Sequence, residues 1–284
     1  MIDWFVKRYR GKGGLLYAGS AVVMLTILFA LASTAVAASG TGAKLGDQES
    51  GSQAGPSSAG SPESASDTFD EFSEFNEFES KAAPEVFDPL IGYNRIMTQV
   101  NDRLYFWALK PAAQAYGTAV PKFVRQCVNR FFDNLGFPVR FVNNLLQLKL
   151  KGAGVETLRF GVNSTLGIAG FMDPARNGLN LSPYEEDFGQ TLGHYGLNGG
   201  FHLVMPLFGP SNFRDTLGGV PDGYLDPMNY MPDSYAIEGV YVLDVVNKTS
   251  LRIGQYESFR KDAMDMYILF RNAYEQNRKK EIEE

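Results

Sequence analysis

Apolar residues recur with the period of an α-helix through most of the chain after residue 84. The clearest case runs from Pro121 to Leu135, where the apolar positions form one continuous stripe. Its members are Phe123, Val124, Cys127, Val128, Phe131, Phe132 and Leu135. Pro121 suits a first helical turn, and Gly136 with Pro138 favours a helix end. Because Cys127 lies on this stripe, we expect it to be a buried apolar side chain and not a nucleophile.

Three further stretches carry helical patterns. Residues 139–149 predict a helix that ends at Gly152, and residues 235–246 fit helix or strand, with helical neighbours favouring helix. A long C-terminal helix is indicated by an apolar face of Phe259, Ala263, Met266, Tyr267, Phe270 and Tyr274. We find no sustained strand alternation, no hairpin signature and no internal repeat. The sequence therefore predicts a mainly α-helical single domain over residues 84–284, large enough to bury a core.

One segment departs from this pattern because it has no charge. Between Phe188 and Phe213 the chain runs 26 residues without Lys, Arg, Asp or Glu, yet it contains six glycines and two prolines. A membrane-spanning helix needs about 20 mostly apolar residues in a row, and this segment is too interrupted to be one. Uncharged, aromatic, glycine-rich backbone suits a place next to lipid that other protein shelters. A glycine-rich core segment of a water-soluble domain is the alternative.

The first 37 residues have the order of an export signal. Basic residues precede an apolar run from Leu15 to Leu31, and Ala35-Val36-Ala37 fits an A-x-A cleavage site. We favour cleavage after Ala37; an uncleaved inner-membrane anchor over residues 15–31 is the alternative. In both cases the basic end stays in the cytoplasm and the rest of the protein lies outside it. The only cysteine is Cys127, so we expect no intramolecular disulfide and no acylated cysteine after the signal.

Residues 38–83 read as a disordered linker. Ser, Gly, Ala and Pro dominate its first part, which has too few apolar side chains to fold. Its second part, residues 69–80, has the sequence FDEFSEFNEFES, and its Phe residues are spaced by three, which gives no clean helical face. This stretch is either a motif that orders on a partner or a solvated tether. The net charge of −6 and the absence of a basic face argue against a nucleic-acid partner.

The sequence carries no recognisable catalytic set. Two histidines and one cysteine exclude the usual zinc clusters, and no G-x-S-x-G, Walker or G-x-G-x-x-G motif is present. The acids at 185–187 precede an expected helix start, where they suit first-turn charges better than a catalytic carboxylate pair. His194 as a base for Ser164 or Ser211 is a weak alternative. We therefore expect no catalytic residue, no metal and no cofactor, and we do not expect an enzyme.

Four motifs together carry a resemblance to a known family. They are FDPLIGYNRIM from Phe87 to Met97, RFGVNSTLGIAGFMDPA from Arg159 to Ala175, EDFGQTLGHYGL from Glu186 to Leu197, and LFGPSNFRDTLG from Leu207 to Gly218. With the closing DMYILFRNAYEQNR, their order and spacing resemble the VacJ/MlaA family of outer-membrane proteins over about residues 84–280. The chain departs from the family at its front end, where the typical acylated cysteine is missing and a long acidic linker stands in place of a short tether.

The resemblance implies a fold and a function. It implies a helical ring or doughnut with a central amphipathic channel, embedded in the inner leaflet of the outer membrane. Phospholipid mislocalised in the outer leaflet would pass through it to a soluble, MlaC-like periplasmic carrier, and trimeric porins would be further partners. Removing an acyl chain into water costs about 0.8 kcal/mol per methylene, so a sheltered route is needed and no covalent chemistry is. The alternative is an envelope scaffold that recruits partners through residues 69–80.

A lipid route requires apolar walls for the tails and neutral polar groups for the headgroup. The expected walls are Phe188, Tyr195, Leu197, Phe201, Leu203 and Val204, and the expected headgroup contacts are Gln190, Thr191, His194 and Asn198. Other positions that match the family motifs are predicted to be structural: Asp88, Pro89, Gly92, Asn94, Arg95, Arg159, Asn163, Gly167, Asp173, Gly189, Gly193, Arg214 and Asp215.

Several of these structural positions have specific expected roles. Gly161, Gly167 and Gly170 are expected to permit close helix approach. The Asn163-Ser164-Thr165 run is expected to bond to the backbone at a helix break or cap. Arg214 and Asp215 predict an ion pair. Asp88-Pro89 is expected to set the turn before the first helix.

Overall fold

The computed structural model describes residues 86–284, so the predictions about the signal sequence, the linker and the 69–80 motif lie outside the described residues. Helices dominate the described part, which confirms the predicted fold class. The elements are α4 (Ile91–Leu104), the π-helix η1 (Tyr105–Leu109), α5 (Lys110–Ala119), α6 (Lys122–Leu135), α7 (Phe137–Leu146), α8 (Leu150–Thr165), α9 (Pro174–Leu179), α10 (Phe188–His194), β1 (His202–Met205), β2 (Gly209–Asn212), α11 (Phe213–Leu225), the 3-10 helix η2 (Pro227–Tyr230), α12 (Ser234–Leu251), α13 (Gln255–Asp262) and α14 (Met266–Glu283).

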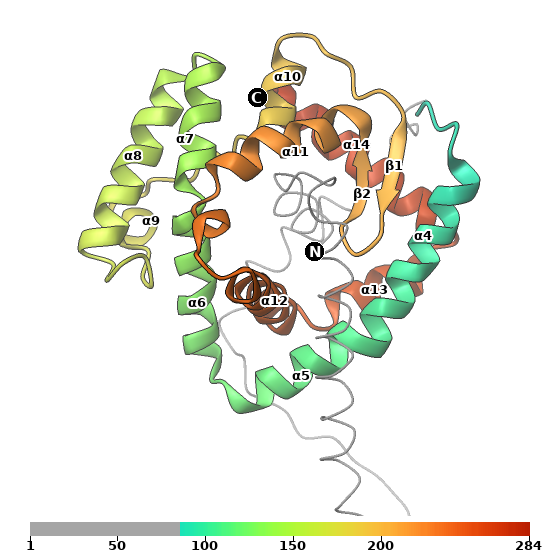
Figure 1. Cartoon of the computed structure of the whole chain (residues 1–284), viewed down its shortest axis with the longest axis horizontal. Helices are drawn as coiled ribbons and strands as arrows, with labels where there is room; N and C mark the ends of the chain where they lie inside the picture. Colours follow the sequence, from blue (N-terminus) through green and yellow to red (C-terminus); the bar gives the residue numbers. More distant parts are fainter. Residues whose placement is uncertain (1–85) are drawn as a thin grey trace, which may run out of the picture.

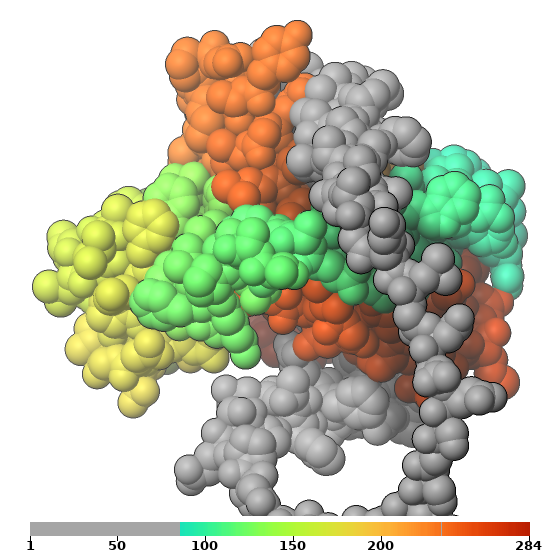
Figure 2. Space-filling view, turned by 90° about the horizontal axis from the view of Figure 1, so that it is seen from below, coloured from blue at the N-terminus to red at the C-terminus, as the bar shows by residue number. Residues whose placement is uncertain are grey.

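The helices follow a ring-like path. In Figure 1, α4 and α5 run along one side and the bottom, α6 and α7 rise along the other side, and α10 and α11 close the top. α12 stands inside this path and is seen nearly along its axis, while α8 and α9 lie outside α7. Edge-on, the chain between α11 and α12 projects from one face, and α8 and α9 form one end of the body (Figure 2). The predicted central channel stays a prediction.

The helix predicted from Pro121 to Leu135 is present as α6. Gly136 is its C-cap, as expected, whereas Pro121 is the N-cap, one residue before the first turn in which we expected it. Cys127 and Phe132 are buried, which confirms the prediction for the cysteine. Phe123, at the other end of the predicted stripe, is exposed, so the apolar stripe extends beyond the core.

The predicted end at Gly152 is wrong. α7 starts immediately after Gly136, because Pro138 lies in its first turn, and it ends at Leu146. A new helix, α8, begins at Leu150 and contains Gly152. A Cβ at Gly152 would lie 1.9 Å from Asn144 Oδ1, so this glycine allows α7 and α8 to pack closely instead of ending a helix.

The C-terminal region is helical but broken. α12 confirms the helical interpretation of residues 235–246. The single long C-terminal helix is wrong: Ala263 is extended, and Asp265 caps a separate helix, α14, by accepting a hydrogen bond from Ile268 N at 3.2 Å. Tyr267, Phe270 and Tyr274 are buried on α14, which confirms the predicted apolar face for the part of it that lies on α14.

The short hairpin of β1 and β2 was not predicted. Its strands pair antiparallel, with His202 opposite Asn212. Four residues per strand and Pro210 within β2 leave too little alternation to recognise. The pairing is completed by tertiary contacts: the buried Asn94 of α4 donates to His202 O at 3.0 Å and accepts from Val204 N at 2.8 Å. A side chain about 110 residues away therefore acts as part of the sheet edge.

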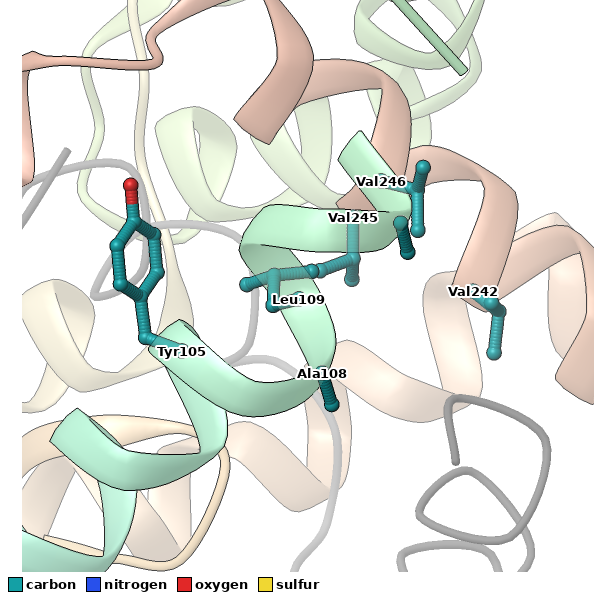
Figure 3. Packing of buried hydrophobic residues seen from close by; sticks show 7 residues of the cluster. Tyr105, Ala108, Leu109, Val242, Val245 and Val246 are labelled. Carbon is teal, nitrogen blue, oxygen red and sulfur yellow. The ribbon is translucent and has the colours of Figure 1, made fainter. Parts of the chain in front are cut away.

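The largest buried apolar cluster joins α12 to the η1–α5 corner. Tyr105, Ala108 and Leu109 meet Val242, Val245 and Val246 there (Figure 3). The corner is a π-helix in which Lys110 N donates to Tyr105 O, five residues earlier. Pro111 follows directly and has no N–H to continue an α-helical ladder, which accounts for the local change of register.

Candidate functional site

The uncharged segment 188–213 forms α10, a loop and the hairpin, and its start is fixed by a cap. Asp187 is the N-cap of α10 and accepts from Gln190 N at 2.8 Å. This confirms that the acids at 185–187 precede a helix start. Glu186, however, is not a first-turn charge: it is buried and pairs with Lys149 Nζ at 2.7 Å and with Gln147 Nε2 at 2.8 Å.

A buried ion network holds α10 and α11 against α14. All five N–H groups of Arg278 donate to carboxylates: to Asp187 at 2.5 and 2.9 Å, to Asp215 at 2.9 Å twice, and to Glu281 at 3.0 Å. Burial alone would lower the pKa of Arg278, but Asp187 and Asp215 raise it well above its usual value. The expected ion pair is present, with Arg214 Nη2 2.9 Å from Asp215 Oδ1.

Asp222 of α11 is a second buried acid beside this network. It accepts from Phe188 N at 2.9 Å and from Asn143 Nδ2 at 2.8 Å, so it joins α7, α10 and α11. Burial, and then the neighbouring Asp187 carboxylate, raise the pKa of Asp222 to about 8. A carboxylic acid is therefore held largely neutral here near physiological pH.

The raised pKa of Asp222 predicts a pH-dependent stability. Folded protein retains a proton on Asp222 that unfolded chain loses near pH 3.8, so the free energy of unfolding falls as pH rises from about 4 to about 8. Asp222→Asn should flatten this part of the pH profile, measured by thermal melting across the range. Asp262→Asn, at an exposed position of α13, is the matched control and should retain the slope. Parallel profiles for the wild type and Asp222→Asn would contradict the assignment.

Two predicted headgroup contacts lie in the protein interior. Gln190 and Thr191 are buried; Gln190 Nε2 donates to Glu185 O at 3.0 Å, and Thr191 Oγ1 donates to Asn143 Oδ1 at 2.9 Å. Gln147 Nε2 also donates to Thr191 Oγ1 at 3.1 Å. These contacts hold α10 against α7. They use the side-chain polar atoms of Gln190 and Thr191 that we expected to contact a lipid headgroup.

The other predicted path residues divide by exposure. Those at the end of α10 and in the following loop are exposed: His194, Tyr195, Leu197 and Asn198. Tyr195 Oη donates to Leu146 O at 2.5 Å, so this exposed group lies beside the end of α7. Phe188, Phe201 and Leu203 are half-buried, and Val204 is buried in β1. Whether they line a lipid path stays a prediction.

The first family motif connects the start of the described chain to its end. Asp88 accepts from Asn94 Nδ2 at 2.8 Å and from the Tyr267 hydroxyl, and Arg271 Nη1 lies 3.5 Å away. Burial and Asp88 raise the pKa of Tyr267 to about 12. Asp88 therefore does more than set a turn with Pro89. Farther along α4, Arg95 pairs with Asp265 at 2.8 Å, and Gly92 has open space around it.

The second motif closes α8 onto α9. Asn163 Nδ2 donates to Asp173 at 2.9 Å, and Asn163 Oδ1 accepts from Ala175 N at 3.1 Å, so Asn163 bonds to backbone near the end of α8 as expected. Arg159 reaches Asp173 at 3.2 Å. Burial raises the pKa of Asp173, but the Asn163 amide, the Arg176 N–H and Arg159 outweigh it and lower the pKa below its usual value.

The motif glycines differ in how much space they have. A Cβ at Gly167 would lie 2.4 Å from Asn163 O, and one at Gly170 would lie 2.6 Å from the Asn134 side chain. Gly161 has no heavy atom within 4 Å of such a Cβ, so its predicted role in close approach is wrong. The reason is that it lies on an exposed face of α8.

Two glycines of the third motif, Gly189 and Gly193, are closely packed. A Cβ at Gly189 would lie 2.3 Å from Asp215 Oδ1, and one at Gly193 would lie 2.6 Å from Ile282 Cδ1. Gly218 of α11 faces the backbone of Gly189, where a Cβ would lie 2.6 Å from Gly189 N. α10 therefore packs against the backbone of α11 and against side chains of α14.

Polar side chains dominate the deepest positions, and large apolar ones are common at the surface. Among the largest fully buried side chains are Arg278, His202, Glu156, Asn94, Asn143 and Asp215. Strongly exposed apolar side chains include Trp107, Phe123, Leu148, Leu150, Leu166 and Leu179. They belong to η1, α6, α8, α9 and the connections on either side of α8.

The described residues 86–284 contain no cluster of His, Cys, Asp and Glu suited to a metal ion. Ser164 Oγ accepts from Asn134 at 3.1 Å, and Ser211 Oγ lies 3.2 Å from Thr216 Oγ1. Within the described residues, no contact therefore supports the alternative in which His194 acts as a base for one of these serines.

Over the same range, none of the helices combines the length and apolar character required to traverse a bilayer.

A sequence model described as MlaA lipoprotein matches residues 86–281, nearly the whole described part. The chain belongs to the MlaA lipoprotein family. One relative, the intermembrane phospholipid transport system lipoprotein MlaA of Haemophilus influenzae, is 32% identical over 206 residues, which cover 70% of this chain and 80% of that protein. The MlaA of Escherichia coli K12 is 31% identical over 190 residues, covering 66% and 75%.

A solved structure of the same family supports the fold. It comes from work described as "Structural basis for maintenance of bacterial outer membrane lipid asymmetry" and superposes with a TM-score of 0.62 at 29% identity, covering 69% of this chain and 98% of that chain. The four motifs that suggested the family fall on the sites described above: the Asp88–Asn94 link, the α8–α9 closure, α10, and the α11 ion pair.

Sequence reasoning missed three members of the buried network: Asn143, Asp222 and Arg278. Arg278 stands in a charged run before the C-terminus, which is typical of a solvated helix end. The available signal was the spacing from Tyr267, Phe270 and Tyr274, because Arg278 follows Tyr274 by four residues and so continues the buried face of α14.

Proposed function

We propose that this protein transports phospholipid at the bacterial outer membrane. It takes up phospholipid mislocalised in the outer leaflet and passes it to a soluble periplasmic carrier, so that lipid asymmetry is maintained. We further propose that the body lies on the periplasmic side of the outer membrane, that trimeric porins are partners, and that the function involves no catalysis. Family membership and the names of the relatives support phospholipid transport as the general function. The direction of transport, the carrier and the side of the membrane on which the body lies are part of the proposal.

The inverted distribution of polarity is the observation that carries this proposal. Buried polar groups in a water-soluble protein are normally a minority at the deepest positions, whereas here they predominate, and those of the Arg278 network and Asn143 are hydrogen-bonded. Large exposed apolar side chains suit hydrocarbon, which does not penalise their exposure. A body of this kind supports lipid contact.

The exposed end of α10 is the favoured position for lipid contact. His194, Tyr195, Leu197 and Asn198 are exposed and belong to the uncharged segment, whereas Gln190, Thr191 and Val204 are occupied by protein contacts. The ion network under α10 fixes this end in place through Arg214 Nη1, which donates to Leu197 O at 3.2 Å. Neutral, rigidly held polar and apolar groups suit a zwitterionic headgroup with its tails.

A charge introduced at Leu197 tests the path. Leu197→Asp places a carboxylate where acyl chains would pass, and we expect the rate of phospholipid transfer to fall by about tenfold or more, because an ionised group near hydrocarbon costs more than 1.4 kcal/mol. The measurement is transfer of fluorescent phosphatidylethanolamine from proteoliposomes to the soluble carrier. Met264→Asp, at a fully exposed position between α13 and α14, is the matched control. Equal transfer by both variants and the wild type would place the path elsewhere.

A further inference from the structure

The outward side of α4 and η1 carries one stripe of large side chains. Ile96, Val100, Arg103 and Trp107 follow one another by four, three and four residues, which places them on the same side of the helix. Ile96 is 59% exposed and Trp107 is 76% exposed, and Arg103 is exposed as well. The inward side of η1 belongs to the largest apolar cluster. This corner therefore has core on one side and an exposed outward stripe on the other.

The charge along this part of the chain is positive. The charged residues from 91 to 120 are Arg95, Asp102, Arg103 and Lys110. The one acid, Asp102, already accepts from Tyr256 Oη at 3.1 Å and pairs with Arg260 Nε at 3.2 Å. Arg95 and Lys110 are paired with other acids, each at 2.8 Å. No carboxylate among the described residues pairs with Arg103, so the outward stripe presents a cation that has no described counter-charge.

Cations also lie over the aromatic ring next to Trp107. Arg260 Cζ lies 4.7 Å from the ring centre of Phe106, and Lys110 Nζ lies 5.3 Å from it. A surface that combines aromatic rings with cations can receive both aromatic side chains and carboxylates. Hydrocarbon, in contrast, penalises a cation that has no counter-charge. The outward stripe is therefore better suited to an acidic, aromatic partner than to acyl chains.

A segment with this complementary character occurs in the same chain. Residues 69–80 lie outside the described part and have the sequence FDEFSEFNEFES, with four Phe, five acids and no basic residue. Rings and carboxylates alternate in it at intervals of one or two residues. Its charge is opposite to that of Arg103, and its rings match the apolar members of the outward stripe.

The described chain begins close to the outward stripe. Phe87 O accepts from His202 N at 3.1 Å, which fixes the chain directly before α4. Trp107 lies 16 residues after Ile91, or about 24 Å along the helix. Residues 69–85 span up to about 55–60 Å when extended, so residues 69–80 can lie along the whole stripe. The exposed Phe123 belongs to α6, which is on the opposite side of the ring in Figure 1.

We propose that residues 69–80 dock on the outward stripe of α4 and η1 in the same molecule. Phe rings of the segment pack against Ile96 and Trp107, and its carboxylates pair with Arg103. Because the segment is attached to the surface that it binds, its effective concentration is in the millimolar range and weak contacts suffice. A partner recruited through this segment would first have to displace it from its own domain. The inference does not depend on phospholipid transport.

The fluorescence of Trp107 reports this contact directly. The sequence has two tryptophans, so the full chain with Trp4→Phe emits from Trp107 alone. In this background, Phe→Ser at positions 69, 72, 75 and 78 should raise the acrylamide quenching constant of Trp107 about twofold, because the tethered segment no longer covers the ring. The emission maximum should move to longer wavelength as the ring returns to water.

A charge reversal tests the role of Arg103. Arg103→Glu should expose Trp107 to the same extent as the Phe→Ser changes do. Adding Glu→Lys at positions 71, 74, 77 and 79 should restore the protection, because the attraction then forms with its signs exchanged. Lys151→Glu makes the same charge change at an exposed position of α8 and should leave Trp107 protected. Thermal melts of these variants should agree with that of the parent chain, which separates loss of docking from loss of the fold.

Four results would overturn the proposal. Equal acrylamide quenching of Trp107 with the native and the Phe→Ser segment would show that the segment does not cover the stripe. Equal quenching of both proteins by lipids brominated in the acyl chain would assign the stripe to the bilayer. Protection that requires a second protein would assign it to a partner. Protection that fades on dilution of the purified chain would assign the contact to a second copy.

Discussion

Arg278→Met should lower the free energy of unfolding by about 3–5 kcal/mol, because removing one partner of a buried ion network leaves the other charges without compensation. Asp187 and Asp215 each receive two hydrogen bonds from this guanidinium, and both hold the neutral segment against α14. The measurement is denaturant unfolding of the purified protein in mild detergent, followed by circular dichroism. We expect the variant to be the least stable of the single substitutions considered.

Lys279→Met is the matched control for this prediction. Lys279 is the next residue on α14, and its pair with Glu283 is exposed at both ends. Its replacement should change the free energy of unfolding by less than about 0.5 kcal/mol. Neutralising the acids as well, in Arg278→Met with Asp187→Asn and Asp215→Asn, should recover part of the lost stability. A small effect of Arg278→Met alone would show that water reaches the network and screens it.

Gly218→Ala should destabilise the protein although it adds only one methyl group. Its added Cβ would lie 2.6 Å from Gly189 N and 2.8 Å from Gly189 Cα, and backbone atoms cannot move aside as a flexible side chain does. We expect a loss of about 1–3 kcal/mol from overpacking, despite the better helix propensity of alanine. Thermal melting measures the loss, and separation of α10 from α11 should appear as faster amide exchange in α10.

Gly161→Ala supplies the opposite control. Gly161 is inside α8 with open space around it, so alanine should stabilise the protein by about 0.5–1 kcal/mol through helix propensity alone. If Gly218→Ala also stabilised the protein, the backbone contact between α10 and α11 would have to be looser than the structure places it.

Local patterns predicted the helices well where local physics decides them. The stripe on α6 and the buried face of α14 follow from side-chain spacing, and Cys127 was placed correctly by the same argument. The missed breaks depend on single residues whose effect is set by context. Pro138 can end one helix or start another, and Gly152 can cap a helix or admit a neighbouring side chain.

The candidate site was harder to predict because its contacts join distant parts of the chain. Thr191 and Gln190 are polar residues in an uncharged segment, which fits a headgroup contact as well as a buried hydrogen bond. Only the approach of Asn143, 48 residues away, decides between them. The family motifs marked the right segments, but a motif does not say which of its members face inward.

The bond between Asp88 and Tyr267 has a consequence for how the protein is made. Its partners are 179 residues apart, and Arg271 reaches the same carboxylate from 183 residues away. During synthesis, α4 can bond to the hairpin once residues 202–205 have emerged, but Asp88 gains its partners on α14 only near the end of translation. A chain interrupted before Met266 would therefore lack the contacts of α14 to Asp88, Asp187 and Asp215, so the ring-like path closes only when translation is nearly complete.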